Sequence, residues 1–215
     1  PFPMIAGKHK GAGMLLYPAQ VAEVLAPIAE YPEIQFSLKM RLGWENASEC
    51  MVLVELLNTL RLSRIALHAR TGKQQYKGHP DLEAFQGFYD LCQHPLYYNG
   101  DIESLSDIRQ ILIRFPLLKG VFIGRGLLSS PLLAKEFKGN ETFLPEQRMS
   151  IYFAFHEELF SAYSQVLQGE TQLLVKMKTL WEYFLPETDR KLLKRIKKST
   201  RLQQYTESVK AIFTS

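Results

Sequence analysis

Residues 34–42 read IQFSLKMRL and residues 64–69 read RIALHA. Both stretches are short and apolar, which is typical of buried strands. Residues 96–99 (LYYN) and 120–123 (GVFI) repeat the pattern, and three of the four stretches are followed directly by glycine. Because helical patterns lie between them, the four stretches predict parallel strands joined by helical crossovers.

The segments between these strands carry helical signals. Apolar residues at helical spacing predict helices over residues 18–31, 47–60, 81–92 and 105–114. Ser104, with Asp107 three residues later, resembles a capping box at the start of the last of these helices. Pro131 fits the first position of a further helix.

Polar side chains inside the strands favour a barrel over an open doubly wound sheet. With a period of two, Lys39 and Arg41 share one face of the first strand, and His68 and Arg70 share one face of the second. The C-terminal ends of barrel strands are where active sites lie. The four side chains predict a cationic mouth that has no obvious internal carboxylate and binds an anion. A structural ion pair or a satisfied core histidine is the alternative.

Two glycine turns follow the last two strands. They are Asn99-Gly100-Asp101 and Gly124-Arg125-Gly126. In barrels, the loops after the last two strands frequently bind phosphate through backbone N–H groups, and glycine lets the backbone approach the ligand. The two turns therefore predict a shared phosphate site, although a glycine after a strand is also an ordinary turn.

Four ordered motifs carry a resemblance to a known family. KMRLGW (39–44), LHARTGKQQYKG (67–78), YNGDI (98–102) and IGRGLL (123–128) resemble the tRNA-dihydrouridine synthase family. The resemblance implies an α/β fold, a (β/α)8 TIM barrel of which residues 1–140 are the C-terminal half. It also implies that residues 145–215 are an all-α helical bundle domain that binds tRNA.

The opening PFPMIAGKHKGAGMLL (1–16) resembles the family segment that follows the catalytic cysteine. That cysteine is expected immediately before Pro1, so no catalytic residue is expected in this chain, which alone is expected to be inactive. The resemblance implies that NADPH reduces FMN, that hydride passes from the flavin to C6 of a flipped-out tRNA uridine, and that the cysteine protonates C5. Cys50 and Cys92 do not match the family position and are interpreted as structural thiols.

The resemblance also assigns binding residues. FMN is expected to contact Lys39, His68, Asn99, Gly100, Asp101, Gly124 and Arg125. Lys39 would stabilise negative charge at the N1/O2 edge of the flavin. The tRNA is expected to contact Lys8, Lys10, Arg41, Arg70 and Tyr76. Tyr76 either stacks on a base or fixes its loop, and the two lysines alternatively belong to a solvated loop.

From Pro145 onward no strand signal remains. Helical patterns cover residues 148–167, 173–184, 188–199 and 202–213, with aromatic residues that suit the core of a small bundle. Within them, LWEYFLP (180–186) resembles a motif of the family's helical domain.

Basic residues concentrate in this C-terminal region. The net charge is +4, yet residues 190–201 (RKLLKRIKKSTR) hold seven basic residues, and their removal leaves 19 basic against 22 acidic. Arg190, Lys194, Lys197 and Arg201 are spaced as one helical stripe. The stripe predicts contact with the RNA backbone, which positions the RNA without reading its sequence. A solvated basic helix face is the alternative.

Composition narrows the remaining choices. With 46% hydrophobic and 22% charged residues, the chain is ordinary globular protein. We expect a cytoplasmic enzyme that is a monomer when intact, with no metal and no membrane association. Two other functions remain open: another FMN-dependent TIM-barrel oxidoreductase that acts on a small molecule, and a non-catalytic RNA-binding fragment. A third alternative is an inert half-barrel that self-associates through its open edge.

Overall fold

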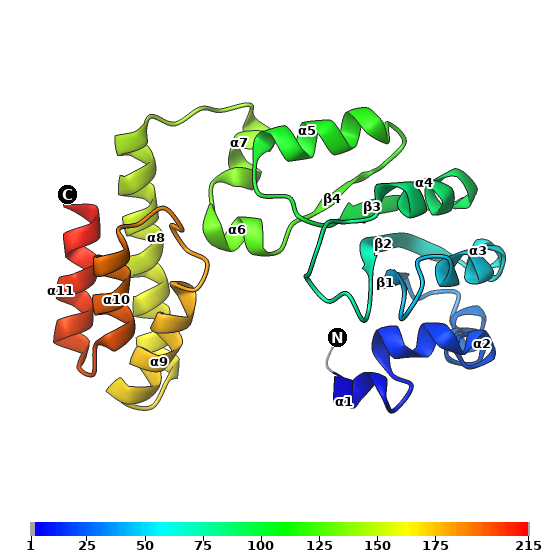
Figure 1. The fold of residues 1–215 in the computed structure, drawn as a ribbon, viewed down its shortest axis with the longest axis horizontal. Helices are drawn as coiled ribbons and strands as arrows, with labels where there is room; N and C mark the ends of the chain where they lie inside the picture. Colours follow the sequence, from blue (N-terminus) through cyan, green and yellow to red (C-terminus); the bar gives the residue numbers. More distant parts are fainter. Residues whose placement is uncertain (1–2, 215) are drawn as a thin grey trace. The chain divides into compact units, whose positions relative to one another are not determined.

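The computed structural model describes residues 3–214. The chain divides into two compact units, Pro1–Ile123 and Gly124–Ser215. The first unit contains a sheet with flanking helices, and the described part of the second unit is helical (Figure 1). The predicted functional boundary at residues 140–145 stays a prediction.

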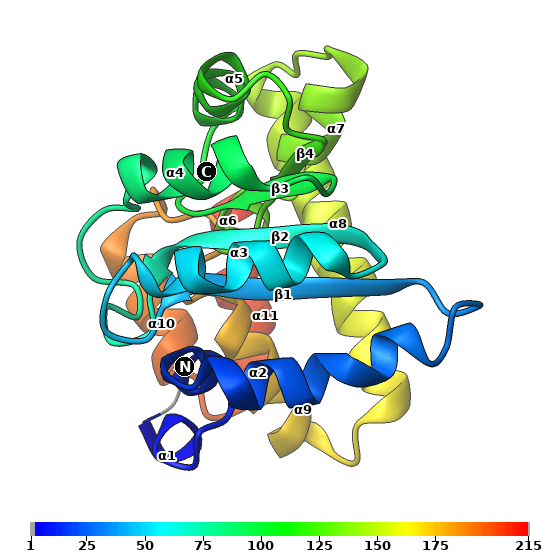
Figure 2. The same ribbon diagram turned by 90° about the vertical axis from the view of Figure 1, so that its right-hand side faces the viewer.

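The sheet of the first unit has four parallel strands in sequence order. They are β1 (Phe36–Gly43), β2 (Leu62–Thr71), β3 (Leu96–Asn99) and β4 (Gly120–Phe122). Figure 2 shows them side by side. The predicted α/β architecture with parallel strands and helical crossovers is therefore confirmed.

Helices precede β1 and connect the successive strands at the predicted places. The elements are α1 (Pro3–Ala6), η1 (Gly11–Leu16), α2 (Pro18–Leu25), η2 (Ala26–Ala29), α3 (Glu49–Thr59), α4 (Leu82–Leu91) and α5 (Leu105–Arg114). The helix predicted over residues 18–31 ends as an α-helix at Leu25, because Pro27 lacks an N–H and the chain continues as a 3₁₀ turn. The capping box is confirmed: Ser104 Oγ accepts from the Asp107 N–H at 3.1 Å, and Asp107 accepts from the Ser104 N–H at 2.8 Å.

The core of the first unit lies between the sheet and its helices, on the side where Figures 1 and 2 show α3 and α4. Leu42, Leu57, Ile65 and Phe85 are completely buried there. Phe85 also makes an edge contact with Tyr98, at 5.1 Å between ring centroids. Burial of one apolar sheet face fixes the register, and with it the face on which the alternate, polar residues lie.

The second unit contains α6 (Arg125–Ser129), α7 (Leu133–Gly139), α8 (Pro145–Val166), α9 (Glu170–Leu180), α10 (Arg190–Lys198) and α11 (Leu202–Phe213). The helix predicted to begin at Pro131 begins at Leu133, after a turn in which the Leu133 N–H bonds the Ser130 carbonyl. Side chains join this segment to α8: Ser130 and Tyr152 share a 2.7 Å hydrogen bond, and Glu136 accepts from Arg148.

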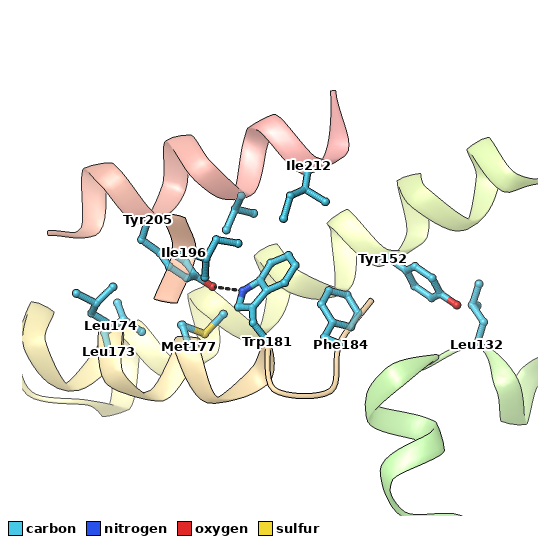
Figure 3. Close-up of a cluster of buried hydrophobic side chains, with 11 residues drawn as sticks. Leu132, Tyr152, Leu173, Leu174, Met177, Trp181, Phe184, Ile196, Tyr205 and Ile212 are labelled. Carbon is cyan, nitrogen blue, oxygen red and sulfur yellow. Dashed lines mark hydrogen bonds between the residues drawn. The ribbon is translucent and has the colours of Figure 1, made fainter. Parts of the chain in front are cut away.

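A cluster of buried aliphatic and aromatic side chains forms the core of the second unit, as Figure 3 shows. At its centre, the Trp181 indole donates to the Tyr205 hydroxyl at 3.0 Å, and that hydroxyl lies 2.7 Å from Nε2 of His156. All three side chains are buried. The prediction that most of the C-terminal aromatic residues form a core is correct for Tyr152, Trp181 and Phe184, whereas Tyr183 is exposed.

No helix between residues 3 and 214 has the length and apolar character that crossing a membrane requires.

Candidate functional site

Polar side chains from three adjacent strands meet on one face of the sheet. In the strand register Arg41 pairs with His68, and His68 pairs with Asn99. The Lys39 ammonium donates to Oδ1 of Asn99 at 3.1 Å, and Nδ2 of Asn99 donates to the Phe122 carbonyl at 2.9 Å. Asn99 therefore orients Lys39 and at the same time ties it to β4.

Arg70 ends in a buried cluster. Its guanidinium binds both carboxylate oxygens of Asp101, one of them at 2.7 Å, and donates to the Gly78 carbonyl at 2.8 Å. The Arg70 side chain is 1% exposed, and its Nε has no hydrogen-bond partner among the described residues. The prediction of a cationic mouth without an internal carboxylate is wrong, because Asp101 follows the next strand and reaches back to Arg70.

His68 adds a neutral imidazole to the site and not a charge. Burial lowers its pKa from 6.5 to about 3, and the nearby cations Arg41, Lys39 and Arg70 act in the same direction. Nη1 of Arg70 lies 3.4 Å from Nε2 of His68. Because a guanidinium only donates, Nε2 accepts and the proton belongs on Nδ1. His68 is thus an N–H donor between cations.

Burial also lowers the pKa of Lys39, with Arg41 acting in the same direction. The pKa of Arg41 is lowered by burial and by Arg70, while Tyr76 opposes the shift. The two cations therefore repel each other in a partly desolvated place, and an anion bound beside them would relieve that repulsion.

Arg41 supports the loop of residues 72–80, which we call the Tyr76 loop. Nη1 of Arg41 donates to the carbonyls of Thr71 at 2.7 Å and Gln75 at 2.9 Å. The Tyr76 side chain is 58% exposed, and its ring centroid lies 5.6 Å from the Arg41 guanidinium carbon and 6.2 Å from the His68 ring. The structure thus brings three predicted site residues together and leaves an aromatic face accessible.

The turn of residues 99–101, here the Asn99 turn, requires its glycine. Gly100 has φ +153°, and a Cβ there would lie 2.8 Å from the Tyr98 hydroxyl. Asp101 has φ +28°, which is unusual for a residue with a side chain. The predicted turn is therefore formed, with Asp101 directed to Arg70.

The remaining predicted flavin ligands, Gly124 and Arg125, are the first two residues of the second unit. Gly124 precedes α6, is exposed, and would accept a Cβ with nothing within 4 Å. Room for a ligand at Gly124 is compatible with the predicted phosphate site, which stays a prediction.

Lys8 and Lys10 lie in the turn between α1 and η1, and both side chains are exposed. Between them, the His9 ring stacks on Tyr17 at 3.9 Å between centroids. Pro1, expected directly after the catalytic cysteine, lies outside the described residues.

A carboxylate that was not among the predicted site residues shapes the loop after β1. Glu49 accepts from the backbone N–H groups of Trp44 at 2.7 Å, Glu45 at 3.1 Å and Asn46 at 2.7 Å. It lies in the first turn of α3, where acidic residues are favoured, and that position was the available signal. Glu49 thereby fixes the loop beyond the end of the strand that carries Lys39 and Arg41.

Neither cysteine is poised for chemistry. Cys50 is completely buried, and burial raises its pKa to about 12. Burial also raises the pKa of Cys92. A high pKa leaves almost no thiolate at neutral pH, which agrees with the interpretation of both as structural thiols.

The basic residues of the second unit are divided by a break in the chain. Arg190, Lys194 and Lys197 lie on α10, but α10 ends at Lys198 and Arg201 precedes α11. The predicted single stripe of four is wrong at Arg201, because Ser199 adopts an extended conformation. All four side chains are exposed. A hollow between α10 and α11 is lined by Lys194 and by three further basic residues, Lys191, Arg195 and Lys198.

A family model described as Dihydrouridine synthase matches residues 1–214. The chain belongs to this family. Relatives include a probable tRNA-dihydrouridine synthase of Aquifex aeolicus, 35% identical over 61% of this chain and 42% of the relative. The tRNA-dihydrouridine synthase B of Vibrio vulnificus is 26% identical over 65% of this chain and 44% of the relative. The tRNA-dihydrouridine(16) synthase of Haemophilus ducreyi is 29% identical over the same shares. The chain thus spans less than half the length of these relatives.

Proposed function

We propose that this chain is part of a tRNA-dihydrouridine synthase, which reduces uridine in tRNA to 5,6-dihydrouridine with FMN and NADPH. The Lys39 ammonium, oriented by Asn99 on the polar sheet face of a chain in this family, carries the proposal. In this reading the parallel sheet is part of a (β/α)8 barrel, and the helical segment from residue 145 is a tRNA-binding bundle. The enzyme is expected to be a cytoplasmic monomer.

The donor set fits an anionic flavin mononucleotide. Lys39 offers an exposed cation, His68 offers a neutral N–H, and Gly124 leaves space at a backbone turn. When bound, FMN supplies the hydride that uridine accepts. Lys39 would hold the edge of the ring where negative charge gathers on reduction. The family resemblance also assigns His68, Asn99, Gly100, Asp101, Gly124 and Arg125 to the flavin.

The binding site for the tRNA substrate would be formed by further residues of the first unit. Tyr76 presents an exposed ring on a loop braced by Arg41, which suits stacking on a base. The family resemblance assigns Lys8, Lys10 and Arg70 to the same side. Lys8 and Lys10 are exposed in a loop. Arg70 is buried, and it would support the Tyr76 loop through its hydrogen bond to the Gly78 carbonyl.

The helical unit would hold the body of the tRNA. Lys194, Lys197 and Arg190 on α10, with Arg201 beyond it, offer exposed cations to phosphates. Such contacts fix the orientation of the RNA and are weakened by salt.

The test is production of dihydrouridine by the full-length protein in a host that lacks its own dihydrouridine synthases. Nucleoside mass spectrometry of purified tRNA, with mapping by position, gives both the reaction and the modified uridine. Dihydrouridine is expected. Its absence, with soluble flavin-loaded protein present, would reject the proposal in favour of a flavoenzyme acting on a small molecule or another RNA.

A further inference from the structure

Arg70 contacts two segments that sequence reasoning assigns to different partners. Asp101 belongs to the Asn99 turn, assigned to the flavin, and Gly78 belongs to the Tyr76 loop, which carries a residue assigned to the tRNA. A single guanidinium binds both, through the Asp101 carboxylate and the Gly78 carbonyl. Its 1% exposure leaves little surface for a ligand of its own.

Both segments need to be held. Gln75 in the Tyr76 loop has φ +53°, and Asp101 in the Asn99 turn has φ +28°. Side-chain residues persist in this region of backbone space when surrounding contacts fix them. Arg41 binds the Gln75 carbonyl, and Arg70 binds the Asp101 side chain. The two arginines thus brace the two strained positions.

We propose that the Arg70–Asp101 pair is a positioning latch that couples the Asn99 turn to the Tyr76 loop. In this role neither residue contacts flavin or tRNA, which revises the direct contacts expected for both. Through its hydrogen bond to the Gly78 carbonyl, Arg70 fixes the position of the Tyr76 loop relative to β2. Asp101 in turn fixes the orientation of the Arg70 guanidinium. The bidentate geometry defines that orientation, which a single contact with a flexible lysine would not.

Amide hydrogen exchange of the ligand-free protein tests the latch. The Gln75 and Lys77 amides bond within the loop, to Gly72 and Gln74. The Gly72 and Lys73 amides instead bond the carbonyls of Gly43, the last residue of β1, and of Trp44, which follows it. In Asp101→Asn we expect Gln75 and Lys77 to exchange about tenfold faster, with Gly72 and Lys73 changed much less.

Arg70→Lys is the second variant, because it keeps both charges of the pair and removes only the bidentate geometry. The same amides should exchange faster than in the native protein. Glu83→Gln is the matched control: it removes a 2.5 Å ion pair with Arg114 in the same unit, which involves no residue of the Tyr76 loop. Unchanged Gln75 and Lys77 exchange in folded Asp101→Asn or Arg70→Lys would overturn the latch, as would equal acceleration by Glu83→Gln.

The consequence for catalysis rests on the proposed function and is measured separately. Asp101→Asn should raise KM for tRNA by about tenfold and change kcat much less, because Tyr76 is displaced while the reacting groups remain. A loss confined to kcat would contradict the latch. The exchange measurements need neither flavin nor RNA, so a protein that makes no dihydrouridine would reject the proposed function and leave the latch to be judged on exchange alone.

Discussion

Lys39 and Asn99 are 60 positions apart, and their side chains meet at 3.1 Å across the intervening strand β2. Asn99 uses its carbonyl oxygen for Lys39 and its amide for the Phe122 backbone. Because both the oxygen and the nitrogen of its side-chain amide are hydrogen-bonded, Asn99 is held in one orientation. Its oxygen therefore holds the Lys39 ammonium in one position. The pair converts a flexible side chain into a fixed cation.

Lys39→Met removes that cation and keeps the length of the side chain. We expect flavin affinity to fall by about tenfold to a hundredfold, because one charge-assisted hydrogen bond is removed. Titration of FMN fluorescence measures it, with Lys119→Met, an exposed lysine before β4, as the control. Unchanged flavin affinity and unchanged flavin reduction would remove Lys39 from the site.

His68 should make the first unit less stable in acid. Its pKa is about 3 in the folded protein and near 6.5 in the unfolded chain, so between these values the unfolded chain binds more protons. This contribution to stability is present above pH 6.5 and is lost as the pH falls towards 3. From pH 7 to pH 4.5 the loss is roughly 3 kcal/mol.

The measurement compares urea unfolding at the two pH values for the native protein and for His68→Gln, in which this component disappears. His94→Gln is the control, because His94 bonds the Leu57 carbonyl away from the arginines. Equal pH dependence in the native protein and His68→Gln would show that His68 is not held neutral.

Tyr205→Phe should destabilise the helical unit. The change leaves the Trp181 indole N–H and Nε2 of His156 without their buried partner, at about 1–3 kcal/mol for each unsatisfied group. Urea unfolding followed by Trp181 fluorescence measures the destabilisation. Tyr163→Phe on α8 alters a tyrosine that is only half-buried and should cost much less. Similar destabilisation in both variants would argue against the hydrogen-bond network.

Lys194→Gln combined with Lys197→Gln should weaken tRNA binding and flatten its dependence on salt. For each phosphate that is no longer neutralised by a lysine, the slope of log affinity against log salt falls by about 0.7–0.9. Binding isotherms at several salt concentrations give the slope. Lys138→Gln changes an exposed lysine of α7 and serves as control. A slope that is identical in all three proteins would exclude α10 from the RNA surface.

The thiols should be inert in the native protein. Cys50, with its pKa raised to about 12 and no exposed surface, is expected to resist alkylation by iodoacetamide at about pH 8, and Cys92 to react slowly. Mass spectrometry of native and urea-unfolded protein compares the labelling. Rapid modification of native Cys50 would reopen the question of its role.

Sequence reasoning placed all four strands, because each is a short apolar run between helical patterns. It also placed Lys39, Arg41 and His68 on one face, since alternation along a strand is a local property. It missed the Arg70–Asp101 pair, which joins residues 31 positions apart and depends on how two loops fold. It also counted His68 as a charge, because the burial that mainly lowers its pKa, and the cations that add to the shift, arise largely from contacts with another strand.

In the helical region, too, features local to one segment were predicted and contacts between segments were not. Periodicity predicted the bounds of α8, α10 and α11 to within three residues, but it extended the helix of α9 to residue 184, whereas α9 ends at Leu180. It also placed Arg201 on the stripe of α10, which ends at Lys198. The break at Ser199 depends on α11 packing back through Tyr205 and Val209, both buried. Periodicity within one segment carries no signal for that turn.

The row of Arg41, His68 and Asn99 across β1, β2 and β3 has a consequence for folding. A slip of one residue in β2 would send His68 into the apolar core and bring Leu67 or Ala69 beside Arg41. The row is complete only when β1, β2 and β3 are all paired in this register. A ligand bound to this row would therefore stabilise the correctly registered sheet over misaligned ones, and retention of the proposed flavin would report strand alignment in variants of this protein.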